Sequence, residues 1–62
     1  MIYALYFHSR NNMADKSTWG KEQLPDDWTE REVADAARLA GVEGYAIVDF
    51  STNKTHAFKW FV

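Results

Sequence analysis

The chain has 62 residues, room for a single domain, and 47% of them are hydrophobic and 16% aromatic. That composition excludes a disordered segment, because chains that stay unfolded lack the apolar side chains needed for a core. The formal net charge of −2 argues against a protein that binds DNA by neutralising phosphates, and it is too small for a polyanionic DNA mimic. With no cysteine and two histidines, we expect no disulfide, no metal site and no cofactor.

The first predicted element is a strand over residues 2–8, which are rich in Tyr, Ile and Phe and contain no breaker. This apolar run follows no basic residue and is too short for a signal sequence or a membrane span, so a cytoplasmic location is expected. Polar residues 9–12 end the strand. Residues 13–27 show neither helical nor strand periodicity. A connection that long either has a role of its own or contains a short element that the pattern does not reveal.

A helix over about residues 29–40 is the best specified element. Thr29 and Glu32 have the spacing of a capping box, in which each side chain accepts a hydrogen bond from the other residue's amide. Trp28 and Val33 have the spacing of a hydrophobic staple across the same helix start. The sequence therefore predicts where this helix begins from two independent local signals.

The end of the helix and its faces are predicted from composition and spacing. Gly41 follows the last turn, where a residue in the left-handed conformation commonly ends a helix. One face is expected to pack on the sheet, and its residues are Val33, Ala36, Ala37 and Ala40. The opposite face is expected to carry a solvated set of charges, Arg31, Asp35 and Arg38.

Two strands, over residues 45–50 and 55–62, are predicted to form a hairpin through the polar loop 51–54, with Asn53 as the residue that takes positive φ. The element order is β-α-β-β. We therefore expect one α+β domain over residues 1–62, with a three-stranded sheet built from the first strand and the hairpin, and one helix on one face. The short hairpin keeps its two strands together, so the first strand is expected at an edge of the sheet, open to pairing with another chain.

No catalytic machinery emerges from the residue pattern, so no enzyme is predicted. Asp49, Ser51 and His56 lie close together across the hairpin, but no glycine-flanked amides are available for an oxyanion hole. Five carboxylates surround the start of the helix: Asp26, Asp27, Glu30, Glu32 and Asp35. They lack the spacing of a calcium loop, and as groups that cap the helix and complement its dipole they are already explained.

Surplus apolar surface is the main functional signal, because one helix covers only one face of a sheet. One assignment turns Leu5, Phe7, Ile47, Phe58 and Trp60 toward the helix and leaves Ile2, Tyr6, Val48, Phe50 and Phe61 on the other face. The reversed assignment exposes an equally apolar set. Soluble monomers rarely leave such patches bare. Residues 9–28, with Met13, Trp19 and Leu24, a second copy of the chain, or a different protein could cover the patch.

The predicted function is accordingly a non-enzymatic protein-interaction module, an inhibitor or adaptor of the kind that phages and mobile elements encode, or a homodimer. No membrane partner is expected. The candidate partner-binding residues are Ile2, Tyr6, Trp19, Val48, Phe50 and Phe61. The alternative is a small domain that binds single-stranded RNA or DNA by stacking bases on sheet aromatics. Its basic residues would be Arg10, Lys16, Lys21, Lys54 and Lys59, although they are scattered along the chain and the RNP sequence pattern is missing.

Overall fold

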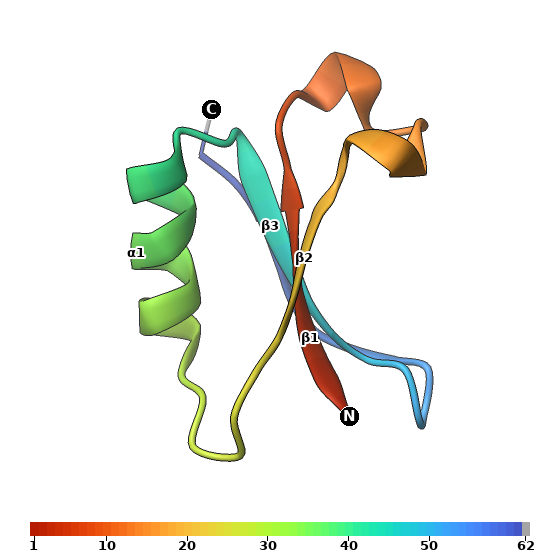
Figure 1. Cartoon of the computed structure of the whole chain (residues 1–62), viewed down its shortest axis with the longest axis vertical. Helices are drawn as coiled ribbons and strands as arrows, with labels where there is room; N and C mark the ends of the chain where they lie inside the picture. Colours follow the sequence, from red (N-terminus) through yellow and green to blue (C-terminus); the bar gives the residue numbers. More distant parts are fainter. Residues whose placement is uncertain (62) are drawn as a thin grey trace.

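The structure is a computed structural model that describes residues 1–61. Its elements in chain order are β1 (Ile2–Phe7), the 3₁₀ turns η1 (Arg10–Asn12) and η2 (Lys16–Thr18), β2 (Gly20–Gln23), α1 (Glu30–Ala40), β3 (Gly44–Asp49) and β4 (Lys54–Trp60). The strands form one antiparallel sheet in the order β2-β1-β3-β4, and α1 lies against one face of it (Figure 1). The α+β class is confirmed, but the prediction of three strands is wrong because the sheet has four.

The additional strand, β2, lies within the segment that showed no periodicity. It pairs antiparallel with β1, from Tyr3 opposite Gln23 to Tyr6 opposite Gly20. Its residues, Gly-Lys-Glu-Gln, have low strand propensity, so the pairing with β1 and not the local sequence makes this segment a strand. As a result β1 lies between β2 and β3, and the expectation that the first strand is an unpaired edge is wrong.

The ends of α1 follow the local signals in the sequence. The Thr29 hydroxyl accepts a hydrogen bond from the Glu32 amide at 3.3 Å. At the other end Gly41 has φ 75°, its amide donates to Arg38, and the Val42 amide donates to Ala37, which is a Schellman ending. The predicted cap by the Thr29 hydroxyl and the left-handed glycine are therefore confirmed. The other half of the predicted capping box is wrong, because among the described residues the Thr29 amide makes no hydrogen bond to the Glu32 carboxylate.

Removing the Thr29 hydroxyl should test this helix start. Thr29→Ala is expected to lower the free energy of unfolding by about 1 kcal/mol, because the first-turn amide loses its acceptor. For a domain of this size, that loss corresponds to a fall in melting temperature of roughly 4–8 °C, measurable by circular dichroism. Thr29→Ser retains the hydroxyl and serves as the control. Equal melting temperatures for the alanine and serine variants would show that the cap contributes nothing.

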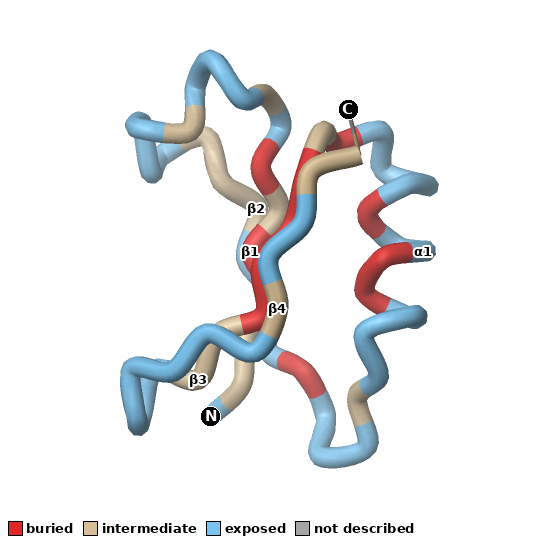
Figure 2. The backbone as a smooth tube through the Cα atoms, turned by 180° about the vertical axis from the view of Figure 1, so that it is seen from behind, coloured by how far each residue is buried: buried red, intermediate tan, exposed pale blue. Residues whose placement is uncertain are grey.

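The face of α1 that packs on the sheet differs from the predicted one. Val33, Ala34 and Ala37 are buried, whereas Ala36 and Ala40 are exposed. Figure 2 shows the buried turns of α1 directed at the sheet. Alanines occur on several sides of this helix, so the apolar pattern could not determine which of them the sheet would cover. The charged side is exposed as expected, and Asp35 and Arg38 form an ion pair there at 3.6 Å.

Two separate apolar clusters lie on the two sides of the sheet. The cluster under α1 contains Ala4, Leu24, Val33, Ala34, Ala37, Val42, Tyr45 and Ile47, with Ile2, Tyr6, Trp28, Ala57 and Phe61 packed against it. The cluster on the other side contains Leu5, Phe7 and Ala46, with Met13, Trp19, Val48 and Trp60 packed against it. The assignment that turned Leu5, Phe7 and Trp60 toward the helix is therefore wrong, and the reversed assignment is closer to the structure.

A hydrogen bond fixes α1 to the sheet on its own side. The Tyr45 hydroxyl donates to the Glu30 carboxylate at 2.7 Å. The pKa of Tyr45 is raised to about 12, mainly because the ring is buried and secondly because of this hydrogen bond. The first turn of α1 is thus joined to β3 by a phenol that remains protonated well above neutral pH.

The predicted hairpin between β3 and β4 is present, and Asn53 has φ 55° as expected. Its register shifts in mid-strand: Ile47 lies opposite Ala57, whereas Val48 lies opposite Thr55, which leaves His56 without a partner in the ladder. The last strand ends at Trp60, earlier than the predicted range of 55–62, and Val62 lies outside the described residues.

Candidate functional site: the open face of the sheet

The face of the sheet opposite α1, here called the open face, is an apolar surface that the helix does not cover. Side chains alternate along each strand, so the register places on it Tyr3, Leu5 and Phe7 of β1, Lys21 and Gln23 of β2, Ala46 and Val48 of β3, and Thr55, Phe58 and Trp60 of β4. Aromatic rings from β1 and β4 thus stand next to one another on this side.

Residues 8–19 cover part of the open face. Trp19 packs its ring edge against Phe7 at 5.0 Å between centroids, and its indole N–H donates to the Met13 carbonyl at 2.9 Å. Leu24, which was named with Met13 and Trp19 for one of the possible covers, lies in the cluster under α1 instead. The segment therefore covers the region around Phe7 and leaves the hairpin side of the open face uncovered.

An aromatic cluster remains accessible on that uncovered side. Phe50 and Phe58 are 46% and 48% exposed, and Trp60 is half-buried. The centroids of Phe58 and Trp60 lie 5.6 Å apart, and each lies 5.5 Å from that of Phe7. The Phe58 and Trp60 rings are thus held by contacts to a buried ring, which limits the conformational entropy that binding would cost. Phe50 lies apart from them, at the far end of β3, where its ring packs on that of Tyr3.

Cationic side chains lie over these rings. The Arg10 guanidinium lies 5.0 Å from the centroid of Trp60. The Lys21 ammonium lies 4.7 Å from Tyr3 and 5.1 Å from Phe50. These distances are typical of cation–π contacts. A hollow of about 290 Å³ lies beside the contact between Lys21 and Phe50, and Leu5, Lys16 and Trp19 complete its lining.

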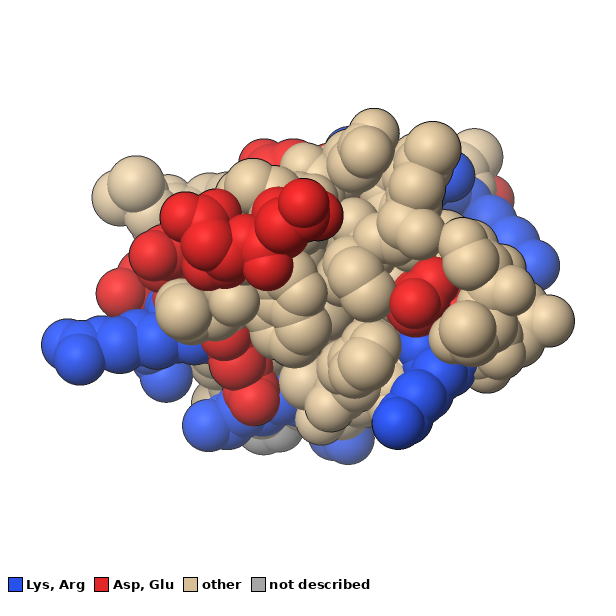
Figure 3. Space-filling view, turned by 90° about the horizontal axis from the view of Figure 1, so that it is seen from below, with Lys and Arg blue, Asp and Glu red and all other residues tan. Residues whose placement is uncertain are grey.

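Charge is distributed unevenly between the two sides of the molecule. Within the four strands, the carboxylates Glu22 and Asp49 alternate to the α1 side, so no strand residue presents a carboxylate on the open face. Seen from below, the largest acidic cluster lies on the side of α1 (Figure 3). Asp15 in the covering segment is bonded within its own turn. It accepts from the Ser17 hydroxyl at 2.6 Å and from the Ser17 amide, and these bonds lower its pKa.

The predicted partner-binding residues do not form one surface. Trp19 and Val48 pack against the open-face cluster. Phe50 packs on Tyr3, with 5.4 Å between the ring centroids. Ile2, Tyr6 and Phe61 pack against the cluster under α1, because even-numbered β1 residues alternate to that side. Sequence reasoning did not select Tyr3, Phe58 or Trp60 as site residues, and it named Arg10 and Lys21 only for the nucleic-acid alternative. Alternation in the last strand had already paired Phe58 with Trp60, so the signal for those two was available.

Asp49, Ser51 and His56 are not arranged as a catalytic triad. The Ser51 hydroxyl accepts from the N-terminal ammonium at 2.9 Å, and the Asp49 carboxylate accepts from the Ser51 amide at 2.9 Å. That hydrogen bond is the main cause of the lowered pKa of Asp49. The His56 ring instead packs on Trp28 at 5.7 Å. Within residues 1–61, no three His, Cys, Asp or Glu side chains gather as a metal site would require.

Comparison of the chain with protein-family models, curated proteins and solved structures found no match. None of the helices in the described part of the chain combines the length and the apolar character needed to cross a membrane.

Proposed function

We propose that this protein is a non-enzymatic binding module that holds another protein on the open face of its sheet. The observation that carries the proposal is the half-exposed ring of Phe58, held beside Trp60. Phe50 is similarly exposed and packs on Tyr3 at the other end of the open face. Large rings that pack into a partner and lose their remaining water contact are typical centres of protein interfaces. Arg10, Lys16 and Lys21 border these rings, so the partner surface that fits has an apolar centre and an acidic rim. We propose further that the bound protein is a host protein, which this chain inhibits or bridges to another. We also propose that it acts in the cytoplasm.

A second copy of the chain is one partner of suitable charge. The acidic side chains near α1, on the far side of the sheet, complement the basic border of the open face. Such contact joins two different surfaces, so it would extend into longer assemblies unless the geometry closes into a ring. A dimer in which two open faces meet would instead oppose like charges at the rim.

Binding of single-stranded RNA or DNA is the second candidate, and the cation–π contacts favour it. Every base has a face that can stack on an aromatic ring, and Arg10 and Lys21 already lie beside such rings. Strands without carboxylates on the open face would also reduce repulsion of phosphates. This candidate requires affinity that falls steeply with salt.

Placing a negative charge on the open face tests both candidates. Phe58→Glu should remain folded, because nearly half of the ring is already in water. It should weaken binding of partner protein, second copy or oligonucleotide by about 30-fold or more, which is the ~2 kcal/mol effect of an interface hot spot. Sedimentation measures association with a second copy. A partner protein is captured from the native lysate, and its Kd is then measured with the purified partner. Fluorescence anisotropy with a labelled single strand, at several salt concentrations, measures oligonucleotide binding.

Leu39→Glu provides the matched control. Leu39 is 92% exposed on α1, on the other side of the molecule, so the same charge there should leave binding of a different protein or of an oligonucleotide unchanged. Equal effects of the two substitutions would contradict a site on the open face. Strong, salt-dependent oligonucleotide binding with no protein captured would favour the nucleic-acid candidate. In that case Lys21→Gln removes one phosphate contact, so the slope of log affinity against log salt concentration should become shallower by about one.

A further inference from the structure

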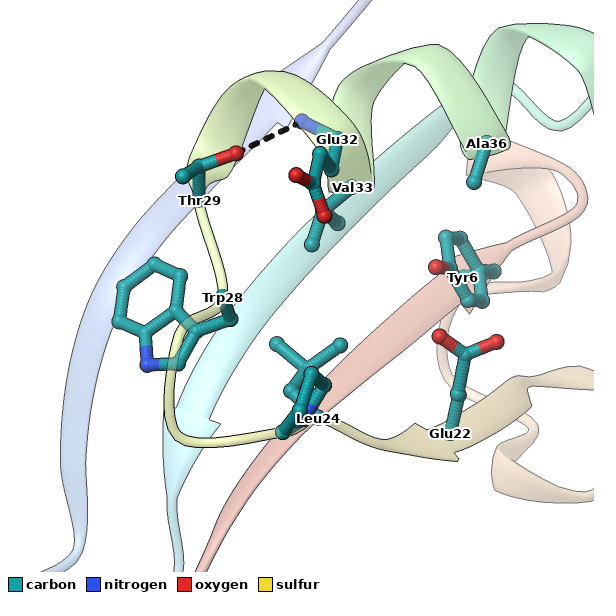
Figure 4. A pocket seen from close by; sticks show the side chains of 9 residues that line it. Tyr6, Glu22, Leu24, Trp28, Thr29, Glu32, Val33 and Ala36 are labelled. Carbon is teal, nitrogen blue, oxygen red and sulfur yellow. Dashed lines mark hydrogen bonds between the residues drawn. The ribbon is translucent and has the colours of Figure 1, made fainter.

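A second concave site lies on the other side of the sheet, between β2, the loop that follows it, and the first turns of α1 (Figure 4). We call it the β2–α1 groove, and its volume is about 180 Å³. It is lined by Tyr6, Glu22, Leu24, Pro25, Trp28, Thr29, Glu32, Val33 and Ala36. At roughly 30 Å³ for each water in the liquid, that space corresponds to about six waters, less than the ~300 Å³ at which drug-sized pockets begin. The groove therefore suits a single side chain.

Two carboxylates approach the groove from different elements. Glu22 comes from β2 and Glu32 from α1, and Figure 4 shows both side chains directed into the space between these elements. Neither carboxylate forms an ion pair with any other residue in the range 1–61. The site therefore carries negative charge that the described part of the chain does not neutralise.

The Tyr6 phenol is the second polar feature of the groove, and it is independent of the acidic pair. Its oxygen is buried and has no hydrogen-bond partner among the described residues. Figure 4 shows it directed into the same space. A buried polar atom without a partner destabilises the folded chain, so a ligand that bonds to it is favoured. Burial, and then the charge of Glu22, raise the pKa of Tyr6, so the neutral phenol can both donate and accept.

The rest of the lining is apolar. Leu24, Val33 and the half-buried ring of Trp28 form walls between the polar groups. A divalent cation needs six or more oxygen ligands, which two carboxylates between apolar walls do not supply. An alkyl chain ending in a cation matches both parts of the lining.

We infer that the β2–α1 groove binds a primary ammonium group on a short alkyl chain, such as the side chain of a lysine. The four-carbon stem of lysine lies against Leu24 and Trp28, and its three N–H donors reach Glu22, Glu32 and the Tyr6 oxygen. This site is separate from the open face, so its success or failure leaves the proposed function untouched.

Titration of the whole protein with small amines, followed by ¹H–¹⁵N chemical shifts, tests the inference. The probes are Nα-acetyl-lysine N-methylamide for a lysine within a polypeptide and n-butylammonium for a free amine. Nα-acetyl-norleucine N-methylamide has the stem without the charge. Both amines should shift the amide signals of residues 22, 24, 29 and 32, and the norleucine compound should not. If butylammonium alone binds, the site still holds and its natural ligand is a free amine.

Variants of the two carboxylates make the test specific. Glu22→Gln and Glu32→Gln should each weaken amine binding by about 3- to 10-fold, as expected for partly solvated charge pairs, and the double variant should abolish it. Asp35→Asn removes an exposed carboxylate from α1 outside the groove and should change nothing. The inference is overturned if the wild-type protein shows no shift with either amine, if norleucine binds as well as lysine, or if the double variant binds amines as tightly as wild type.

Discussion

Replacing Phe7 with alanine is expected to lower the free energy of unfolding by about 3–5 kcal/mol, which is typical of deleting a buried ring. Phe7 is 2% exposed, and its ring contacts those of Trp19, Phe58 and Trp60 at 5.0–5.5 Å. At 0.05–0.15 kcal/mol per residue, the whole domain is stable by only about 3–9 kcal/mol. The variant should therefore be largely unfolded at physiological temperature, with a urea midpoint far below that of the wild type.

Phe58→Ala is the matched control for that experiment. It removes the same ring from a neighbouring position on the open face, but Phe58 is already 48% exposed. Its loss should therefore cost only about 1 kcal/mol. If the two variants had equal urea midpoints, the second cluster of the sheet would not be centred on Phe7, and the covering segment with Trp19 would not contribute to stability.

The second large effect is expected at Gly44. A Cβ placed there would approach the Lys59 carbonyl oxygen at 2.8 Å and would collide with the ring of Trp60 on the paired strand. The backbone carbonyl cannot rotate away without breaking the β3–β4 ladder. Gly44→Ala should therefore cost about 1–3 kcal/mol, as overpacking does, even though glycine-to-alanine changes in unstrained backbone commonly stabilise.

Gly20→Ala is the control for this prediction. Gly20 also lies in a strand, but its nearest neighbour would be the Tyr6 Cβ at 3.3 Å, a distance that a small shift of β2 can relieve. Thermal melts followed by circular dichroism should show a much lower melting temperature for the Gly44 variant than for the Gly20 variant. Similar melting temperatures would mean that Trp60 does not pack across Gly44.

The candidate sites were only partly visible in the sequence. The surplus of apolar surface was anticipated, and Trp19, Val48 and Phe50 do lie on the side away from α1. Tyr6 was expected on that surface and instead lines the β2–α1 groove. The groove itself could not be anticipated, because Glu22 approaches Glu32 only when β2 pairs beside β1.

The sequence by itself determined the elements whose causes are local. The Thr29 hydroxyl accepts from an amide three residues away, Gly41 ends the helix through hydrogen bonds to carbonyls of the last turn, and Asn53 turns the hairpin within its own loop. Only the tertiary structure decided that residues 20–23 form a strand and which side of the sheet α1 covers. Both depend on contacts between residues distant along the chain: the backbone of β1 supplies the hydrogen bonds for β2, and the close approach of Ala37 to the sheet selects the side with Ala4 and Ile47. Alternation defines two faces but does not rank them when both are equally apolar.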